Sequence, residues 1–173
     1  MSLGLKRIVY TAVGIALFTV LTLCLQVPVF QNYYLCLGYI AMAVYCYSVG
    51  TVSGMVVGCF GVVLYCLLTN GLRGMPGWAL GNLVIGAGMG LISKWIKRID
   101  KKAVRFWLWT FVAALSTAAG ILVIKSLVDS IIRSQPFLAR VAMNVYAFVA
   151  DLVVLAIAFP VCEKLDELIS RKL

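Results

Sequence analysis

Histidine is absent from this chain of 173 residues, and charged residues of either sign are scarce. Only 12% of the residues are charged, and none lies between Arg7 and Arg73. Without histidine, the commonest metal ligand and acid–base group of proteins near neutral pH is missing. The six cysteines include no C-x-x-C pair and lie mostly in apolar segments, so we expect neither a structural zinc site nor a disulfide framework.

Catalytic and nucleotide-binding motifs are missing as well. The chain has no G-x-S-x-G nucleophile elbow, no H-E-x-x-H metalloprotease motif and no G-x-x-x-x-G-K-[ST] phosphate loop. We therefore expect neither an enzyme nor a bound cofactor or metal. Any ATP-driven process would need an ATPase on a separate chain.

Apolar residues, in contrast, make up 64% of the chain, and its mean hydropathy is +1.06. Soluble domains contain roughly 45 to 50% apolar residues. The net charge of +9 is compatible with nucleic-acid binding, but the basic residues cluster at the ends of apolar segments, so no nucleic-acid partner is expected. The composition predicts one integral membrane domain over residues 1–173, all-α in class, with the lipid bilayer as its solvent.

Polar breaks divide the chain into six expected transmembrane helices. The second is short, and the boundary between the second and the third is the weakest. The expected helices cover approximately residues 8–26, 34–49, 52–70, 78–95, 106–127 and 138–161.

The basic residues predict the topology of these helices. Lys6 and Arg7 precede the first helix, and six more basic residues lie between positions 94 and 105. The positive-inside rule places both groups at the cytoplasmic face, which requires an even number of spans between them. Six spans with both termini in the cytoplasm leave 11 basic residues inside and four outside.

Glycines at four-residue spacing indicate helix faces on which backbones approach closely. We expect these faces to pack mainly within the bundle. The glycines are Gly50, Gly54 and Gly58, Gly77 and Gly81, and Gly86 and Gly90.

Two segments carry a resemblance to a known family. The first expected helix contains the run T-A-V-G-I-A-L, in which Ala12 and Ala16 are one turn apart. Residues 70–82 read N-G-L-R-G-M-P-G-W-A-L-G-N, which is similar to the turn before helix 4 in vitamin-type members. With its six helices and basic ends, the chain resembles over essentially its whole length the S components of energy-coupling factor (ECF) transporters.

The resemblance implies a function and partners. An S component of this type is a high-affinity membrane subunit that captures a vitamin or related nutrient from outside a prokaryotic cell. It docks on a transmembrane scaffold subunit that carries two cytoplasmic ATPases, and here the docking residues would be Ala12 and Ala16. The metal-binding branch of the family is disfavoured because this chain lacks histidine.

The expected ligand face lies on the last helix. Arg140, Asn144 and Asp151 occupy positions i, i+4 and i+11 and therefore one side of that helix. A charged group turned to lipid costs several kcal/mol, so this side should face the bundle interior. Arg140 and Asp151 lie about 16 Å apart along the axis, so each needs another partner, which a ligand, a neighbouring helix or water could supply. We expect the opposite wall of the site to contain Tyr33, Tyr34, Arg73, Trp78, Asn82 and Lys125.

Other interpretations remain open from the sequence. Asp151 could be the ion-coupling group of a small oligomeric carrier or channel. A structural membrane protein without a ligand is another alternative. Asp129 and Arg133 could also simply pair with each other across one helical turn.

Overall fold

The structure is a computed structural model that describes residues 3–30 and 33–170 of the chain. It consists of helices, two of which continue into π-helical turns, and one small hairpin. In chain order the elements are α1 (Leu3–Cys24), β1 (Gln26–Phe30), β2 (Tyr33–Cys36), α2 (Gly38–Val44), η1 (Tyr45–Val49), α3 (Thr51–Leu68), α4 (Met75–Ile96), α5 (Lys102–Thr117), η2 (Ala118–Lys125), α6 (Ser126–Arg133) and α7 (Phe137–Ser170).

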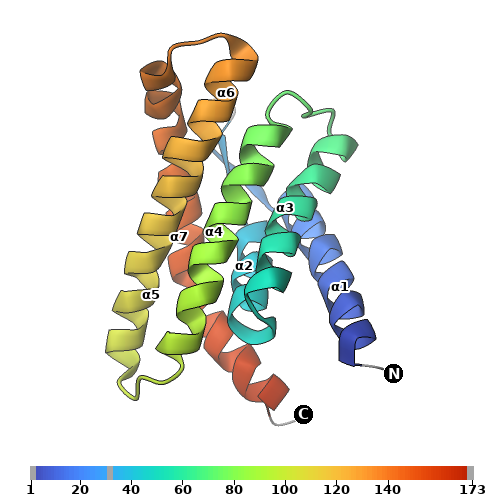
Figure 1. Cartoon of the computed structure of the whole chain (residues 1–173), viewed down its shortest axis with the longest axis vertical. Coiled ribbons are helices and arrows are strands. Elements are labelled where there is room, and N and C mark those ends of the chain that lie inside the picture. The colour runs from blue at the N-terminus through green and yellow to red at the C-terminus, as the bar shows by residue number, and fades with distance from the viewer. Residues whose placement is uncertain (1–2, 31–32, 171–173) are drawn as a thin grey trace.

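The helices lie side by side along one axis, and the chain reverses direction at each connection (Figure 1). The start of α1, the end of α7 and the connection between α4 and α5 all lie at one end of the bundle. We call this the basic end, because Lys6, Arg7 and the basic residues from Lys94 to Arg105 belong to it. The turns between α3 and α4 and between α6 and α7 lie at the opposite end.

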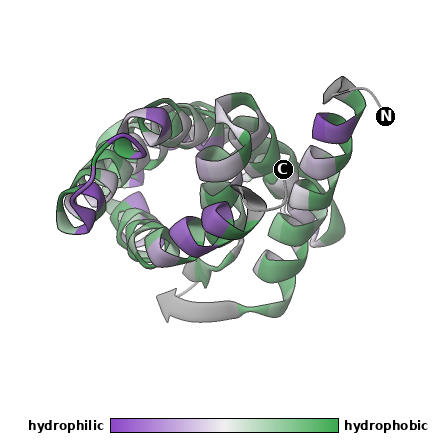
Figure 2. Ribbon diagram, turned by 90° about the horizontal axis from the view of Figure 1, so that it is seen from below, coloured by the Kyte–Doolittle hydropathy of each residue, from purple (hydrophilic) through white to green (hydrophobic). Residues whose placement is uncertain are grey.

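Within residues 3–30 and 33–170, five helices are long and apolar enough to cross a membrane, which supports the expected helical membrane protein. Large apolar side chains cover their outer sides: Val52, Leu91 and Phe111 are 73%, 64% and 61% exposed. Seen from the basic end, the ribbons of the helices are mostly green, which marks apolar residues, with shorter purple hydrophilic stretches (Figure 2). Such broad apolar faces suit lipid, since soluble monomers rarely expose them.

The expected helix at residues 34–49 differs most from the structure. Tyr33–Cys36 is instead the second strand of a hairpin, in which Gln26 pairs with Cys36 and Val27 with Leu35. Adjacent aromatic residues favour a strand, and pairing satisfies the backbone polar groups of both segments. The helical part that remains, Gly38–Val49, has 12 residues and spans about 18 Å, less than the roughly 30 Å hydrocarbon core.

Other helices extend beyond the boundaries expected from hydropathy. Helix α1 begins at Leu3, the helical segment of α5, η2 and α6 covers 102–133, and α7 continues to Ser170. Backbone hydrogen bonding does not stop where the apolar segment stops, so these helices include charged turns at their ends.

Glycine allows α4 to pack closely against two neighbours. A Cβ atom on Gly81 would lie 2.7 Å from the carbonyl oxygen of Gly120 in η2. One on Gly90 would lie 2.5 Å from the Cα atom of Thr51 in α3. The glycines within α3 and α4 are therefore packed inside the bundle, as expected from the sequence, whereas a Cβ atom on Gly50, just before α3, would meet nothing within 4 Å.

Ion pairs tie the helices together at the basic end. Arg105 of α5 contacts Glu163 of α7 at 2.7 Å and donates a 2.6 Å hydrogen bond to the hydroxyl of Tyr47 in η1. Lys97, just after α4, pairs with Asp166 of α7 at 2.7 Å. These contacts fix the short α2–η1 segment against the longer helices.

Candidate functional site

A buried carboxylate organises the end of the bundle opposite the basic end. Asp129 of α6 is 1% exposed, and its Oδ2 atom accepts from Lys125 Nζ at 2.8 Å and from Arg140 Nη2 at 2.9 Å. Two cations therefore share one carboxylate oxygen. This cluster, which we call the outer cluster, joins η2, α6 and the first turns of α7.

Amide and hydroxyl groups extend the outer cluster toward the bundle centre. Lys125 Nζ also donates to Asn144 Oδ1 at 2.7 Å, and Asn144 Nδ2 donates to Ser126 Oγ at 2.9 Å. Ser126 Oγ in turn donates to the carbonyl of Ile121, five residues earlier. The wider π-helical turn of η2 changes which side chains face α7, and such turns occur frequently at functional sites.

A second group of buried polar side chains, the inner cluster, surrounds the hydroxyl of Tyr39 in α2. Tyr39 donates to Asn82 Oδ1 at 2.8 Å and accepts from Trp78 Nε1 at 2.8 Å. Asn82 Nδ2 donates to the carbonyl of Gly58 at 3.0 Å. Asp151 of α7 lies close enough to Tyr39 to interact with it electrostatically, so the inner cluster connects α2, α3, α4 and α7.

The two clusters are neighbours rather than separate sites. Asp151 of the inner cluster is attracted electrostatically to Lys125 of the outer cluster. Strand β2 packs beside them against α7. Burial and the nearby charge of Asp151 both raise the pKa of the Cys36 thiol in this strand, which keeps the thiol neutral.

Six of the nine expected ligand residues are members of these clusters. They are Lys125, Arg140 and Asn144 in the outer cluster and Trp78, Asn82 and Asp151 in the inner cluster.

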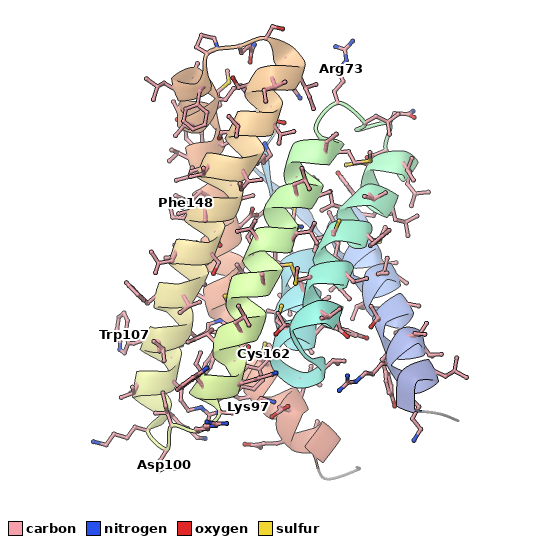
Figure 3. The ribbon with its side chains drawn as sticks, in the orientation of Figure 1. Arg73, Lys97, Asp100, Trp107, Phe148 and Cys162 are labelled. Atoms are coloured by element: carbon pink, nitrogen blue, oxygen red, sulfur yellow. The ribbon has the colours of Figure 1, made fainter. Side chains whose placement is uncertain are left out.

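The other three expected ligand residues lie elsewhere or cannot be placed. Arg73 lies in the exposed turn after α3, and its side chain points away from the bundle (Figure 3). Tyr33 and Tyr34 lie on β2, but their side chains fall outside the described part of the structure.

Sequence reasoning missed Tyr39, Ser126 and the central role of Asp129. The sequence allowed Asp129 to pair with Arg133, whereas the structure pairs it with Lys125 and Arg140. The signal that could have indicated Lys125 was its position one helical turn before Asp129. The pairing also gives Arg140 a protein partner, so Arg140 does not need a ligand to balance its charge.

Several polar atoms of the outer cluster still lack partners. Asp129 Oδ1 and Arg140 Nε are buried and form no hydrogen bond among the described residues, and the same holds for Thr117 Oγ1 beside η2. A Cβ atom on Gly77 would lie 2.8 Å from Asp129 Oδ1, so this oxygen faces the first turn of α4. Buried polar atoms without partners are costly, and a bound polar molecule could satisfy them.

The site offers hydrogen bonds and aromatic surface rather than metal ligands. Within residues 3–30 and 33–170, no three His, Cys, Asp or Glu side chains gather to hold a metal ion. The groups present are suited to binding an organic molecule by its polar edge.

Comparison with known proteins gives two matches. A family model described as "ECF-type riboflavin transporter, S component" matches residues 2–165. A UPF0397 protein from Streptococcus thermophilus is 26% identical over 156 residues, which cover 89% of this chain and 86% of that protein. Both alignments extend over most of the helices rather than over one motif.

The role of Asp129 can be tested by removing its charge alone. Asp129→Asn removes the carboxylate charge that contacts both Lys125 and Arg140, which should lower stability by about 3 to 5 kcal/mol. Thermal unfolding of the purified protein in detergent measures the loss. Asp100→Asn, in the exposed α4–α5 connection, is the matched control and should change stability by less than about 0.5 kcal/mol. Equal unfolding temperatures for Asp129→Asn and the parent would contradict this role.

Proposed function

The chain belongs to the family of ECF-type riboflavin transporter S components, and from this premise we propose that it captures a vitamin outside the cell for delivery through a separate ATP-driven module. Membership confirms the resemblance expected from the sequence. It makes the chain a membrane substrate-binding subunit of an ECF transporter and not an enzyme. The observation that carries the proposal is the family match over residues 2–165.

Riboflavin is the first candidate ligand, because the family description names it. This vitamin joins a flat aromatic ring system with a hydrogen-bonding edge to a chain of hydroxyl groups, and it carries no net charge. The formal charges of Lys125 and Arg140 are balanced by those of Asp129 and Asp151, so the two clusters suit an uncharged molecule. The amides of Asn82 and Asn144 can serve polar edges, and Trp78 offers an aromatic surface.

We assign the ligand face to both clusters, with distinct roles. Arg140, Asn144 and Lys125 would bind the polar part of the ligand nearest the outside. Trp78, Asn82 and Asp151 would contact the part that enters deepest. Tyr33, Tyr34 and Arg73 stay in the proposal as residues of an entrance, which we place between the hairpin and the α3–α4 turn.

The proposed topology is a single membrane domain with six passes and both termini in the cytoplasm of a prokaryotic cell. Among the described residues, five helices are long and apolar enough to cross a membrane, and the proposal takes the shorter Gly38–Val49 segment as the remaining pass. The start of α1, the end of α7 and the basic α4–α5 connection share one end of the bundle, which supports a cytoplasmic basic end (Figure 1).

Docking on a transmembrane scaffold subunit with two ATPases is proposed for the outer face of α1. Ala12 and Ala16 are both exposed on this face, whereas Gly14 and Phe18 are buried against the bundle. Small exposed residues one turn apart let a partner helix approach closely. The sequence has no phosphate loop of its own, so ATP hydrolysis is assigned to the partner subunits.

The ligand assignment predicts tight riboflavin binding by the purified chain without any ion gradient. Titration in detergent, followed by quenching of flavin fluorescence, should give one site per chain. Asn144→Ala removes the amide that links Lys125 and Ser126 and should weaken binding about ten- to 150-fold, the loss expected for hydrogen bonds with charged partners.

The control removes a positive charge from the same end of the bundle. Arg133 is exposed at the end of α6, and Arg133→Ala should bind as tightly as the parent. If the folded parent protein does not bind riboflavin, the choice of this vitamin is wrong. If Asn144→Ala binds as tightly as the parent and keeps its helical circular-dichroism spectrum, α7 is not the ligand face.

The docking assignment predicts that ligand binding and transport can be separated. Ala12→Trp or Ala16→Trp should leave ligand affinity unchanged but abolish co-purification with the scaffold and ATPases, because a bulky side chain blocks close helix approach. Ile157→Trp places the same bulk on the exposed side of α7 and should not affect the assembly. If both Ala12→Trp and Ala16→Trp co-purify normally with the scaffold and ATPases, these residues face lipid and do not form the docking surface.

A further inference from the structure

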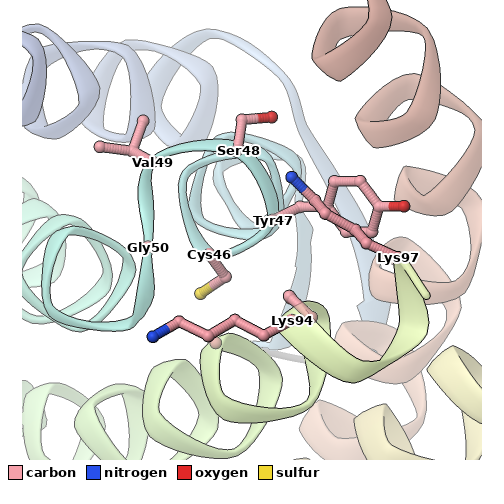
Figure 4. A pocket seen from close by; sticks show the side chains of 9 residues that line it. Cys46, Tyr47, Ser48, Val49, Gly50, Lys94 and Lys97 are labelled. Carbon is pink, nitrogen blue, oxygen red and sulfur yellow. The ribbon is translucent and has the colours of Figure 1, made fainter. Parts of the chain in front are cut away.

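A hollow of about 150 Å³ lies at the basic end, remote from both polar clusters (Figure 4). It opens between η1, the start of α3 and the last turns of α4, and its wall includes Ser48, Gly50, Ser93, Lys94 and Lys97. One water takes up roughly 30 Å³ in the liquid, so the hollow can hold a small polar group such as phosphate. Pockets for drug-sized ligands are about 300 to 1,000 Å³, so a whole vitamin does not fit.

Positive charge faces this hollow. Lys94 forms no ion pair or hydrogen bond within residues 3–30 and 33–170, although it lines the hollow. Lys97 contacts Asp166 at 2.7 Å, and its ammonium lies 4.6 Å from the ring centre of Tyr47. An ammonium group has three N–H donors, so Lys97 can still donate to a further acceptor. The negative charge of Asp166 balances the positive charge of Lys97, so the positive charge of Lys94 remains without a counter-charge among the described residues.

Polar groups without partners line the hollow as well. Ser48 Oγ is buried and has no hydrogen-bond partner among the described residues. Helix α3 begins directly after Gly50, which lines the hollow, and no side chain caps the N–H groups of its first turn. Gly50 has φ +133°, a conformation that L side chains rarely adopt, and a Cβ atom there would meet nothing within 4 Å. This glycine turn brings the start of α3 to the open side of the hollow.

The level of the hollow relative to the membrane indicates a lipid headgroup as its ligand. Trp95, next to Lys94, is 67% exposed, and Trp107 on α5 is 70% exposed at the same end (Figure 3). Exposed tryptophans are enriched at the membrane–water interface. The guanidinium of Arg98 lies 5.8 Å from the ring centre of Trp95, which adds a further cation at this level. The hollow therefore lies where lipid phosphates lie.

We propose that this hollow is a phosphate-binding site occupied by the headgroup of an anionic lipid such as phosphatidylglycerol. The phosphate receives hydrogen bonds from Lys94, Lys97, Ser48 and the first turn of α3. A bound headgroup holds η1 and α3 against the end of α4. This site is additional to the vitamin site of the proposed function, and its assignment to the cytoplasmic leaflet rests on the proposed topology.

The test is a lipid titration of the purified full-length chain, followed by native mass spectrometry. Phosphatidylglycerol should bind the parent protein at one preferred site, and zwitterionic phosphatidylcholine should bind at least tenfold more weakly. Lys94→Gln should weaken phosphatidylglycerol binding about tenfold or more, the loss of a charged hydrogen-bond partner. Ser48→Ala changes no charge and should weaken it about two- to tenfold.

The matched control is Lys102→Gln, which removes the same charge at the exposed start of α5. One surface lysine adds about 1 kcal/mol of general attraction to anionic lipid, so this control should lose no more than about fivefold. Unchanged binding by both Lys94→Gln and Ser48→Ala would overturn the proposal. If Lys102→Gln lowers phosphatidylglycerol affinity as much as Lys94→Gln does, the proposal is also overturned, because that result would indicate general attraction between the basic end and anionic lipid.

Two further measurements identify the source of the phosphate and separate this site from the vitamin site. If inorganic phosphate binds the parent as tightly as phosphatidylglycerol does, the ligand is a soluble phosphate and the lipid assignment is wrong. Lys94→Gln should bind riboflavin like the parent, which shows that it is folded. If the parent fails to bind riboflavin, only the proposed vitamin function fails, since the lipid titration gives an independent result.

Discussion

The outer half of this protein depends on one carboxylate. Hydrocarbon offers no hydrogen bonds, so every charged group between the helices must find its partner within the protein or in a ligand. Asp129 meets this requirement for Lys125 and Arg140 together, and the same lysine reaches Asn144 on α7. Through these contacts α6, η2 and α7 are held in one arrangement, and Arg140 and Asn144 of α7 are buried inside the bundle.

Both ends of the bundle combine ion pairs with buried polar atoms that form no hydrogen bond among the described residues. At the outer end these atoms include Asp129 Oδ1 and Arg140 Nε. At the basic end, two ion pairs connect α7 to the end of α4 and to α5, namely Lys97 with Asp166 and Arg105 with Glu163. Arg105 also donates a hydrogen bond to Tyr47.

Much of the fold could be predicted from the sequence, because apolar length and polar breaks determine where helices can cross lipid. The alignment of Arg140 and Asn144 on one face of α7 also followed from helical spacing. The hairpin at Tyr33–Cys36 could not be predicted, since its pairing depends on the tertiary packing of β2 against α7. The contact of Asp129 with Arg140 depends on the π-helical turn and on the angle between two helices, which local patterns do not specify.

In the proposed function, the two polar clusters hold a vitamin while the protein is in its membrane. The most direct measurement identifies, by mass spectrometry, the small molecules released when the chain is purified from that membrane and then denatured. We expect the released molecules to include one vitamin in about equal molar amount to the protein. The same vitamin should be absent from an unrelated membrane protein purified in parallel. The protein must be folded and purified without added ligand competitors. If it then releases no small molecule above that background, the proposed vitamin binding is contradicted.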